Sequence, residues 1–451
     1  MKLQNNTIPM EKSKWQKVIC DVEVYPNCFL CGIQDVDTKE KIVWEISDRI
    51  NEYDEVVKFF KEFNQYLISF NGIHYDNCII LYIIHNKIDN VEDYLQKLKE
   101  WSDYIINNDF WWNDSELKKY KYQNKWIDID LYLYWSKMLR LSKKISLKGL
   151  AIQMNYPVVQ ELPFDPSMSL NHAQIDELRH YNSVHDLGIT DLLFTQFTGK
   201  GTVPLGNLGT VQLRHDISQK YNLKCMSWDG PKMASELLLQ EYCKITNLNP
   251  KHVKSLKFQH TNKLELPPID FKLDCFKKLY IGMSNALNEF NEEIVLLHGN
   301  TALKLTYGKG GLHSVNKNER YSKDVKTSDV ASLYPNLIIN YGLFRQPEVV
   351  AFYTDVKVRR IKAKKEKNIS EDAMLKLILN SLSGMIDNEY SWLYYPEGAM
   401  KLRLMGQLIL TLTIERLVLA GYQVVSANTD GIEVIVPQDR ALEYEQIVDQ
   451  V

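Results

Sequence analysis

Two aspartates stand where extended segments end, in positions suited to hold a divalent cation. Asp329 closes a polar extended run and opens the segment 329–335 (DVASLYP), while Asp430 lies between the alternating segments 422–428 (YQVVSAN) and 432–436 (IEVIV). An Asp-Gly pair between two period-2 segments predicts a β-hairpin with Asp430 in its turn. Carboxylates at strand ends suit Mg²⁺, which takes oxygen ligands and substrate phosphates. Alternatively, both are ordinary turn residues, which Asp favours.

Between these aspartates, the segment 376–384 (KLILNSLSG) repeats polar or small residues every four positions. On a helix, Lys376, Asn380 and Gly384 would share one face, which presents a cation, an amide and bare backbone. Such a face suits contact with phosphates, a sugar and a base. Upstream, the basic run 357–367 places Arg360 and Lys364 on one helix face. A solvated helix face is the usual fate of such a run, and that alternative stays open.

A second set of carboxylates lies near the N-terminus. Asp21 and Glu23 follow the apolar run 17–20 (KVIC), Asp76 closes the segment 71–76 (NGIHYD), and Asp186 lies in 180–190 (HYNSVHDLGIT), which reads as a helix. One Asp-x-Glu pair is weak evidence. The order and spacing of all six segments are the stronger signal.

Together, the six segments resemble the motifs of the family B DNA polymerases of tailed phages. The three C-terminal segments resemble polymerase motifs A, B and C, and the three N-terminal ones resemble the proofreading 3′–5′ exonuclease. The resemblance implies two-metal Mg²⁺ sites, in which Mn²⁺ can substitute. Their ligands would be Asp329, Val330 and Asp430 in one site, and Asp21, Glu23, Asp76 and Asp186 in the other.

The same resemblance implies contacts with primer–template DNA and dNTPs. Tyr334 would exclude a 2′-hydroxyl by its bulk, and the remaining nucleotide-binding residues would be Ser332, Leu333, Arg360, Lys364, Lys376 and Asn380. The implied DNA-binding residues are Asn71, Tyr75, Lys148, Tyr307, Gly310 and Gly311. The alternatives are core tyrosines, a plain glycine turn over 307–311, and surface lysines, with Lys144 competing with Lys148.

The sequence departs from the family pattern at several positions. Asn428 stands where motif C has its first Asp, and Ser383 stands where motif B has Tyr. In the third exonuclease motif, Asn182 takes the place of a Tyr four residues before Asp186, and Tyr181 lies one residue further back. Because an α-helix turns about 100° per residue, we expect the Tyr181 hydroxyl to miss the attacking water.

Nothing after Asp430 resembles the family's Lys-x-Tyr element or its thumb. From the resemblance we expect a template-directed DNA polymerase with a 3′–5′ proofreading exonuclease. The alternatives are an exonuclease only, or an incomplete polymerase subunit that needs a second polypeptide for the thumb.

Composition adds weaker constraints. The 451 residues suggest roughly three domains. A net charge of −3 argues weakly against nucleic-acid binding, although local charge matters more than the sum. The seven Cys lack a paired CxxC spacing and indicate free thiols in a reducing compartment. With no signal peptide and no membrane-length apolar run, we expect no membrane partner and a place in the cytoplasm of a phage-infected or prophage-carrying host cell.

The pattern predicts an α/β plus α+β multidomain chain. We expect an RNase H-like exonuclease domain over 14–200, a boundary loop at 198–210, and a mostly helical connecting region over 201–285. The palm would occupy 286–350 and 393–451, with short helical fingers over 351–392.

Overall fold

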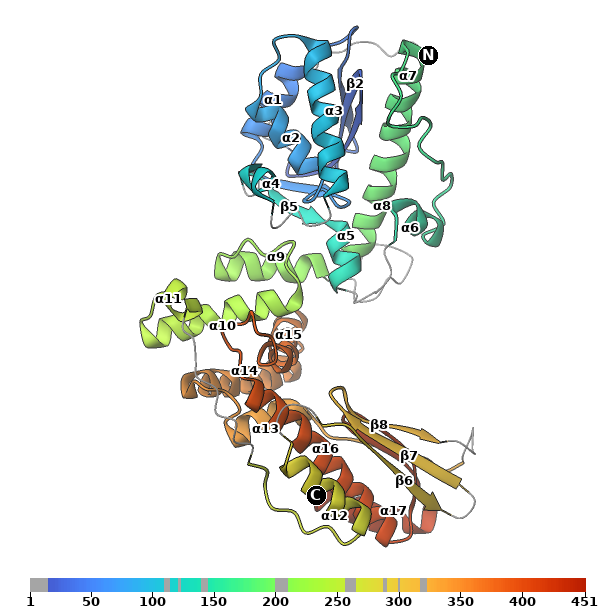
Figure 1. The fold of residues 1–451 in the computed structure, drawn as a ribbon, viewed down its shortest axis with the longest axis vertical. Coiled ribbons are helices and arrows are strands. Elements are labelled where there is room, and N and C mark those ends of the chain that lie inside the picture. The colour runs from blue at the N-terminus through green and yellow to red at the C-terminus, as the bar shows by residue number, and fades with distance from the viewer. Residues whose placement is uncertain are drawn as a thin grey trace. The chain divides into compact units, whose positions relative to one another are not determined.

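The computed structural model describes residues 15–108, 114–120, 123–138, 145–198, 210–255, 265–286, 290–298, 301–316 and 323–451. The chain divides into two compact units, Met1–Asp229 and Gly230–Val451. Each unit contains one β-sheet with associated helices, so the predicted mixed α/β character is confirmed (Figure 1). The predicted boundary loop, apart from residues 198 and 210, and Lys144 lie outside the described residues. The five predicted domain ranges stay predictions.

The sheet of the first unit has the strand order β3-β2-β1-β4-β5. The central strand β1 (Lys17–Tyr25) runs antiparallel to β2 (Cys28–Asp35) and parallel to β4 (Tyr66–Ser69). The outer strands are β3 (Lys41–Ile46), antiparallel to β2, and β5 (Ile127–Asp130), parallel to β4. β1 is central and buried on both faces, which explains why apolar residues dominate it.

Helices cover both faces of this sheet. Val18, Cys20 and Val22 of β1 belong to one core, which includes residues of the helices α1 (Tyr53–Glu62), α2 (Asp76–His85), α3 (Val91–Asn107) and α4 (Ser115–Tyr120). Ile19 belongs to a core on the opposite face with α6 (Leu147–Gln153) and α8 (Leu187–Phe197). Since side chains alternate along a strand, Asp21 and Glu23 share the face of Ile19.

The remaining helical elements of the first unit are short or lie beside this frame. They are α5 (Leu131–Leu133), α7 (His172–Tyr181), α9 (Thr210–Tyr221) and two π-helices, η1 (Tyr134–Met138) and η2 (Asn182–Asp186). The η2 segment directly joins α7 to α8, as predicted for a helix over 180–190, but with a π turn inside it.

The sheet of the second unit has the order β6-β7-β8-β10-β11-β9, and its neighbouring strands pair antiparallel. Its strands are β6 (Glu292–His298), β7 (Thr301–Gly308), β8 (Gly311–Asn316), β9 (Val325–Asp329), β10 (Gln423–Asn428) and β11 (Gly431–Ile435). The predicted hairpin at Asp430 is confirmed, because Asn428 pairs with Gly431 across a two-residue turn. The long helix α16 (Pro396–Leu419) and the helices α12 (Asp274–Ser284) and α17 (Ala441–Asp449) share a core with the sheet.

Other helices of this unit form a separate packed group. It contains α10 (Gly230–Thr246), α14 (Pro347–Lys365) and α15 (Ile369–Met385), which contact one another, while α13 (Leu333–Tyr341) contacts α14 and α16. The shorter elements are α11 (Pro250–Ser255) and the 3₁₀ turn η3 (Gln438–Arg440). Across the described residues, none of the helices has the length and apolar character needed to cross a membrane.

Candidate active sites

The first unit brings three of its four predicted carboxylates into one cluster. Ligand oxygens of Asp21, Glu23 and Asp186 all lie within 4.8 Å of one another. Asp21 and Glu23 come from the same face of β1, and Asp186 ends the π-helix η2 that covers this face. Such an all-oxygen set fits a hard divalent cation such as Mg²⁺ or Mn²⁺.

Asp76, the fourth predicted carboxylate, lies beside this cluster and is bound to the same strand. It opens α2, is only 5% exposed, and its Oδ1 accepts a hydrogen bond of 3.1 Å from the backbone N–H of Val22. Val22 lies between Asp21 and Glu23 in β1. The hydrogen bond therefore holds the Asp76 carboxylate next to both of these residues. The two segments, far apart in sequence, therefore meet as predicted.

The electrostatics of the cluster also suit a bound cation. Burial is the main cause that raises the pKa of Asp76 to about 7 and that of Asp186 to about 6. The pKa values of Asp21 and Glu23 are also well above their ordinary values, because burial and the neighbouring carboxylates disfavour their charged forms. Only protons or a positive charge relieve this repulsion, so the side chains fit a metal site.

A buried carboxylate that the sequence analysis missed holds one of the predicted loops. Asp130, at the end of β5, is fully buried and accepts backbone hydrogen bonds from Asn71 (3.0 Å) and Ile73 (3.2 Å). These bonds fix the turn that leads into Asp76. The repeated Ile-Asp-Ile-Asp of 127–130 was the available signal, because alternating acids in a short strand are unusual.

The predicted DNA-contacting residues of the first unit take different positions. Asn71 is at the start of the turn with a left-handed φ of 67°, and its Oδ1 lies 3.0 Å from His74 Nδ1. Tyr75 packs against the core and its hydroxyl bonds Ser102 at 2.8 Å, as the core-tyrosine alternative expects. Lys148 bonds Glu161 at 2.9 Å, and its positive charge offsets part of the rise that burial causes in the pKa values of Glu23 and Asp186.

The Tyr181 hydroxyl lies beside the acidic cluster, and the expectation that it misses the attacking water stays a prediction. The hydroxyl donates to Asp186 Oδ1 at 3.4 Å. The helix here is not a regular α-helix, because η2 closes with a bond from Leu187 N to Asn182 O, five residues back. This wider turn takes up the extra residue between Tyr181 and Asp186.

In the second unit, strand pairing places the two predicted polymerase aspartates side by side. Asp329 ends β9 opposite Gly431 of β11, and the N–H of Val330 donates to the carbonyl of Asp430 at 2.8 Å. Both aspartates are exposed. Gly431 leaves room for the Asp329 carboxylate, since a Cβ there would lie 1.9 Å from Asp329 Oδ1. Exposed carboxylates at adjoining strand ends fit a cation shared with a substrate.

Asn428 has its own partner in the sheet. Its Oδ1 lies 2.9 Å from His313 Nδ1 and accepts from the Thr429 hydroxyl at 3.2 Å. The turn is further held by the bond from Thr429 N to Leu312 O at 2.7 Å. The amide oxygen that replaces a carboxylate is therefore engaged by β8, which explains how the turn accommodates this residue.

The segment after Asp329 forms a tight connection into α13. Ser332 adopts a left-handed conformation with φ of 54°, which is strained for a residue other than glycine, and Leu333 is buried. The Tyr334 ring lies against α16, where a Cβ on Gly406 would be 3.1 Å from its Cε1. Burial raises the pKa of Tyr334, the positive charge of Arg403 opposes this rise and the negative charge of Asp430 adds to it.

The residues predicted on α14 and α15 are either exposed or paired with an acidic residue. Lys376, Asn380 and Gly384 are all exposed on one face of α15, as the four-residue spacing predicted. Lys364 is exposed on α14, whereas the Arg360 guanidinium bonds Asp372 at 3.1 Å and ties α14 to α15. Ser383 lies on α15 and is half-buried.

Sequence reasoning missed Lys357, the first residue of the basic run. Its ammonium hydrogen-bonds the side-chain oxygen of Asn336, whose amide group donates to the carbonyl of Ala331 at 2.9 Å. Lys357 therefore connects α14 to the segment that follows Asp329. Its place in the basic run does not indicate this bond, because the bond depends on how α13 and α14 pack together.

The turn between β7 and β8 lies next to the Asp430 hairpin. Tyr307 is 1% exposed and its hydroxyl lies 3.1 Å from Thr411 Oγ1, so its side chain belongs to the core. The core-tyrosine alternative thus describes the Tyr307 side chain, and a DNA contact of this turn through its backbone stays a prediction. Gly310 is exposed, and Gly311 has a φ of +113° with Thr429 within van der Waals distance of its missing Cβ. Here glycine permits both the turn and the close approach.

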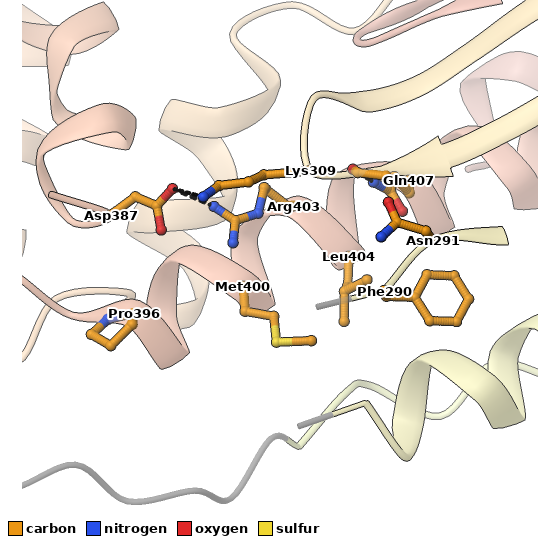
Figure 2. A pocket seen from close by; sticks show the side chains of 10 residues that line it. Phe290, Asn291, Lys309, Asp387, Pro396, Met400, Arg403, Leu404 and Gln407 are labelled. Atoms are coloured by element: carbon orange, nitrogen blue, oxygen red, sulfur yellow. Dashed lines mark hydrogen bonds and ion pairs between the residues drawn. The ribbon is translucent and has the colours of Figure 1, made fainter. Parts of the chain in front are cut away.

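A small cavity of about 110 Å³ opens beside this turn (Figure 2). Lys309 lies 3.9 Å and Arg403 2.9 Å from Asp387, so the acid neutralises part of the positive charge on the cavity wall. Gln407 donates to the carbonyl of Gly308 at 2.8 Å and holds the turn against α16. These contacts fix the turn beside the candidate polymerase site.

Comparisons with known proteins gave one kind of match. No family model matches the chain, and no curated protein matches it. Among solved structures, the chain is similar to the family B DNA polymerase from the hyperthermophilic archaeon Pyrobaculum calidifontis, with a TM-score of 0.49 and 15% sequence identity. The match covers 96% of this chain and 55% of that chain, so the chain spans about half the length of that polymerase.

Proposed function

We propose that this chain carries a template-directed DNA polymerase site in its second unit and a 3′–5′ proofreading exonuclease site in its first. The observation that carries the proposal is that each unit brings its own carboxylates together from distant segments. The Asp21, Glu23 and Asp186 cluster is one such site, and the Asp329–Asp430 pair at adjoining strand ends is the other. The substrates would be primer–template DNA and dNTPs in phage-type replication.

The exonuclease proposal is supported by the sheet and by the side chains around the cluster. The strand order 3-2-1-4-5, with β1 to β3 antiparallel and β4 and β5 parallel to β1, supports an RNase H-like domain. Asp76 and Lys148 supply a further carboxylate and a nearby cation. When bound, divalent cations would activate water and stabilise the leaving oxygen. The chain's own part is to hold the primer end and orient these carboxylates.

The polymerase proposal is supported by three features of the second unit besides Asp329 and Asp430. The backbone of 330–333 turns sharply into α13, where it would cradle a triphosphate. Tyr334 lies beside this turn, with its ring fixed against Gly406, where bulk would exclude a ribose 2′-hydroxyl. The exposed face of Lys376, Asn380 and Gly384 offers groups for phosphate, sugar and base. Phosphoryl transfer needs mainly positioning and charge neutralisation, and these groups supply both.

Separation of the two activities tests the proposal. A labelled primer–template is incubated with Mg²⁺, with and without dNTPs. Asp329→Ala should abolish elongation and leave shortening intact, whereas Asp21→Ala with Glu23→Ala should do the reverse. Glu433→Ala is the matched control for the first change, because Glu433 is an exposed carboxylate elsewhere on β11. Equal loss of both activities in either variant would contradict the two-site proposal.

The alternative is an exonuclease only, or an incomplete polymerase subunit that needs a second polypeptide. The specific observation in its favour is Asn428, which brings an amide bonded to His313 where a third carboxylate is expected. Shortening by the wild-type chain with and without dNTPs, and no elongation, would favour this alternative. Elongation restored by a second polypeptide would identify the subunit form.

A further inference from the structure

We propose that Asn182 is a positioning residue of the acidic cluster, placed there by the π turn η2, and that it orients Asp21 for metal binding. This inference rests on the proposed exonuclease function. Its central observation is a hydrogen bond of 2.7 Å from Asn182 Nδ2 to Asp21 Oδ2. Asn182 is fully buried, so water does not compete for this bond.

The sheet provides a slot made for this amide. Gly32 of β2 pairs directly with Asp21 of β1. A Cβ on Gly32 would lie 1.9 Å from Asn182 Oδ1, so the amide occupies the space that any other residue at position 32 would fill. Directly opposite residues on neighbouring strands are the closest side-chain neighbours in a sheet. The absence of a side chain at 32 therefore lets Asn182 reach across to Asp21.

The π turn is held by donors from outside the helix. A wider turn leaves carbonyls without their usual helical partners. Lys41 donates to the carbonyl of Ser183 at 2.5 Å, and the Tyr156 hydroxyl donates to that of Val184 at 2.8 Å. A Cβ on Gly188 would lie 2.3 Å from the Tyr156 hydroxyl, so this glycine admits the tyrosine.

The extra residue of the π turn lets two neighbouring side chains contact the cluster. With the π turn, Tyr181 still reaches Asp186 and Asn182 reaches Asp21, so consecutive residues contact two different carboxylates of the cluster. The Asn182 amide fixes one Asp21 oxygen and leaves the other for a cation. Partners of ligating carboxylates typically change metal affinity by roughly 10–100-fold when removed.

Direct metal binding tests this role without relying on turnover. Mn²⁺ is titrated into the DNA-free wild type and into Asn182→Ala, followed by electron paramagnetic resonance, and the Mn²⁺ dependence of single-strand degradation is measured in parallel. We expect Asn182→Ala to weaken Mn²⁺ binding at this site by about 10-fold or more. His180→Ala, an exposed change on the same helical segment, should leave Mn²⁺ binding unchanged.

Gly32→Ala supplies a second, independent perturbation. Its Cβ displaces the Asn182 amide while residue 182 keeps its identity, so Mn²⁺ binding should weaken to a similar extent. The double variant Gly32→Ala with Asn182→Ala should be no weaker than Asn182→Ala alone, because both changes break one interaction.

The outcomes separate the two proposals. Unchanged Mn²⁺ affinity in a folded Asn182→Ala variant, even with a lowered Tm, would overturn the positioning role. Additive losses in the double variant would do so as well. A wild type that binds no Mn²⁺ and degrades no DNA would instead contradict the proposed exonuclease.

Discussion

Gly431→Ala offers a selective way to disturb the candidate polymerase site. A Cβ at position 431 would lie 1.9 Å from Asp329 Oδ1 and 3.1 Å from Asp329 Cγ. Gly431 is not among the described glycines with positive φ, which are Gly311, Gly342 and Gly421, so alanine can adopt its backbone conformation. The expected effect is therefore steric and acts mainly on the Asp329 carboxylate, with a lesser contact of 3.2 Å to the carbonyl of Ser328.

The size of the effect follows from the displacement. Non-bonded heavy atoms rest at about 3.5 Å, so the Asp329 oxygen must move by more than about 1 Å. A misplacement of about 1 Å in a catalytic constellation can cost about 100-fold in rate. This corresponds to about 2.7 kcal/mol of transition-state stabilisation. Alanine in a strand is favourable compared with glycine, which offsets the tight contact of 3.2 Å with the Ser328 carbonyl, so we expect only a small change in folding stability.

Single-nucleotide incorporation is the assay for this variant. It is measured under single-turnover conditions in the Asp21→Ala, Glu23→Ala background, so that degradation does not mask elongation. Single-strand degradation by Gly431→Ala alone, with the first unit unaltered, is the internal control and should equal wild type. Wild-type incorporation by a folded Gly431→Ala chain would refute the argument that Gly431 makes room for a functional Asp329.

Three further predictions follow from the sites. For the metal-free chain, the raised pKa values of Asp76 (about 7) and Asp186 (about 6) mean that the folded state binds more protons than the unfolded state between about pH 4 and pH 7. The stability of the first unit should therefore fall as pH rises through this window, which lowers its Tm by several degrees. Added Mg²⁺ should reverse this loss. A Tm that rises with pH in the presence of a chelator would contradict the prediction. Tyr334→Ala should raise ribonucleotide incorporation by at least about 10-fold relative to dNTPs, measured as the ratio of kcat/KM values; an unchanged ratio would remove the steric role. Asp130→Ala leaves the backbone N–H groups of Asn71 and Ile73 without their acceptor, which should cost about 1–3 kcal/mol of unfolding free energy and lower degradation. Urea unfolding and a strand-degradation assay check the last prediction, and a fully stable, active variant would show that Asp130 does not hold this turn.

Local patterns predicted the elements that carry the carboxylates. The Asp-Gly pair at 430–431 between alternating segments gave the β10–β11 hairpin, and the four-residue spacing of Lys376, Asn380 and Gly384 gave their shared exposed face. Both features depend on backbone geometry over a few residues. The sequence was sufficient there because period and turn chemistry determine the result locally.

Interactions between segments far apart in the sequence could not be predicted from local patterns. Nothing local distinguishes a π turn from an α-helix at 182–186, because its released carbonyls are bound by Lys41 and Tyr156 from other elements. The pairing of Arg360 with Asp372 depends on helix packing. The burial of Tyr307 depends on α16, which supplies Thr411 about a hundred residues later in the chain.

The order of strands in the two sheets has a consequence for synthesis on the ribosome. Each compact unit is one continuous stretch of chain, and β1 and β2 are consecutive in it, so they can pair as soon as both have emerged. In contrast, β9 finds its partner β11 only after the whole of 330–430 has been made. Domains generally fold as units, the N-terminal one first during translation. The Asp21 cluster can thus form before β11, the partner strand of Asp329, has been synthesised. Nascent chains should therefore acquire the candidate nuclease site before the candidate polymerase site.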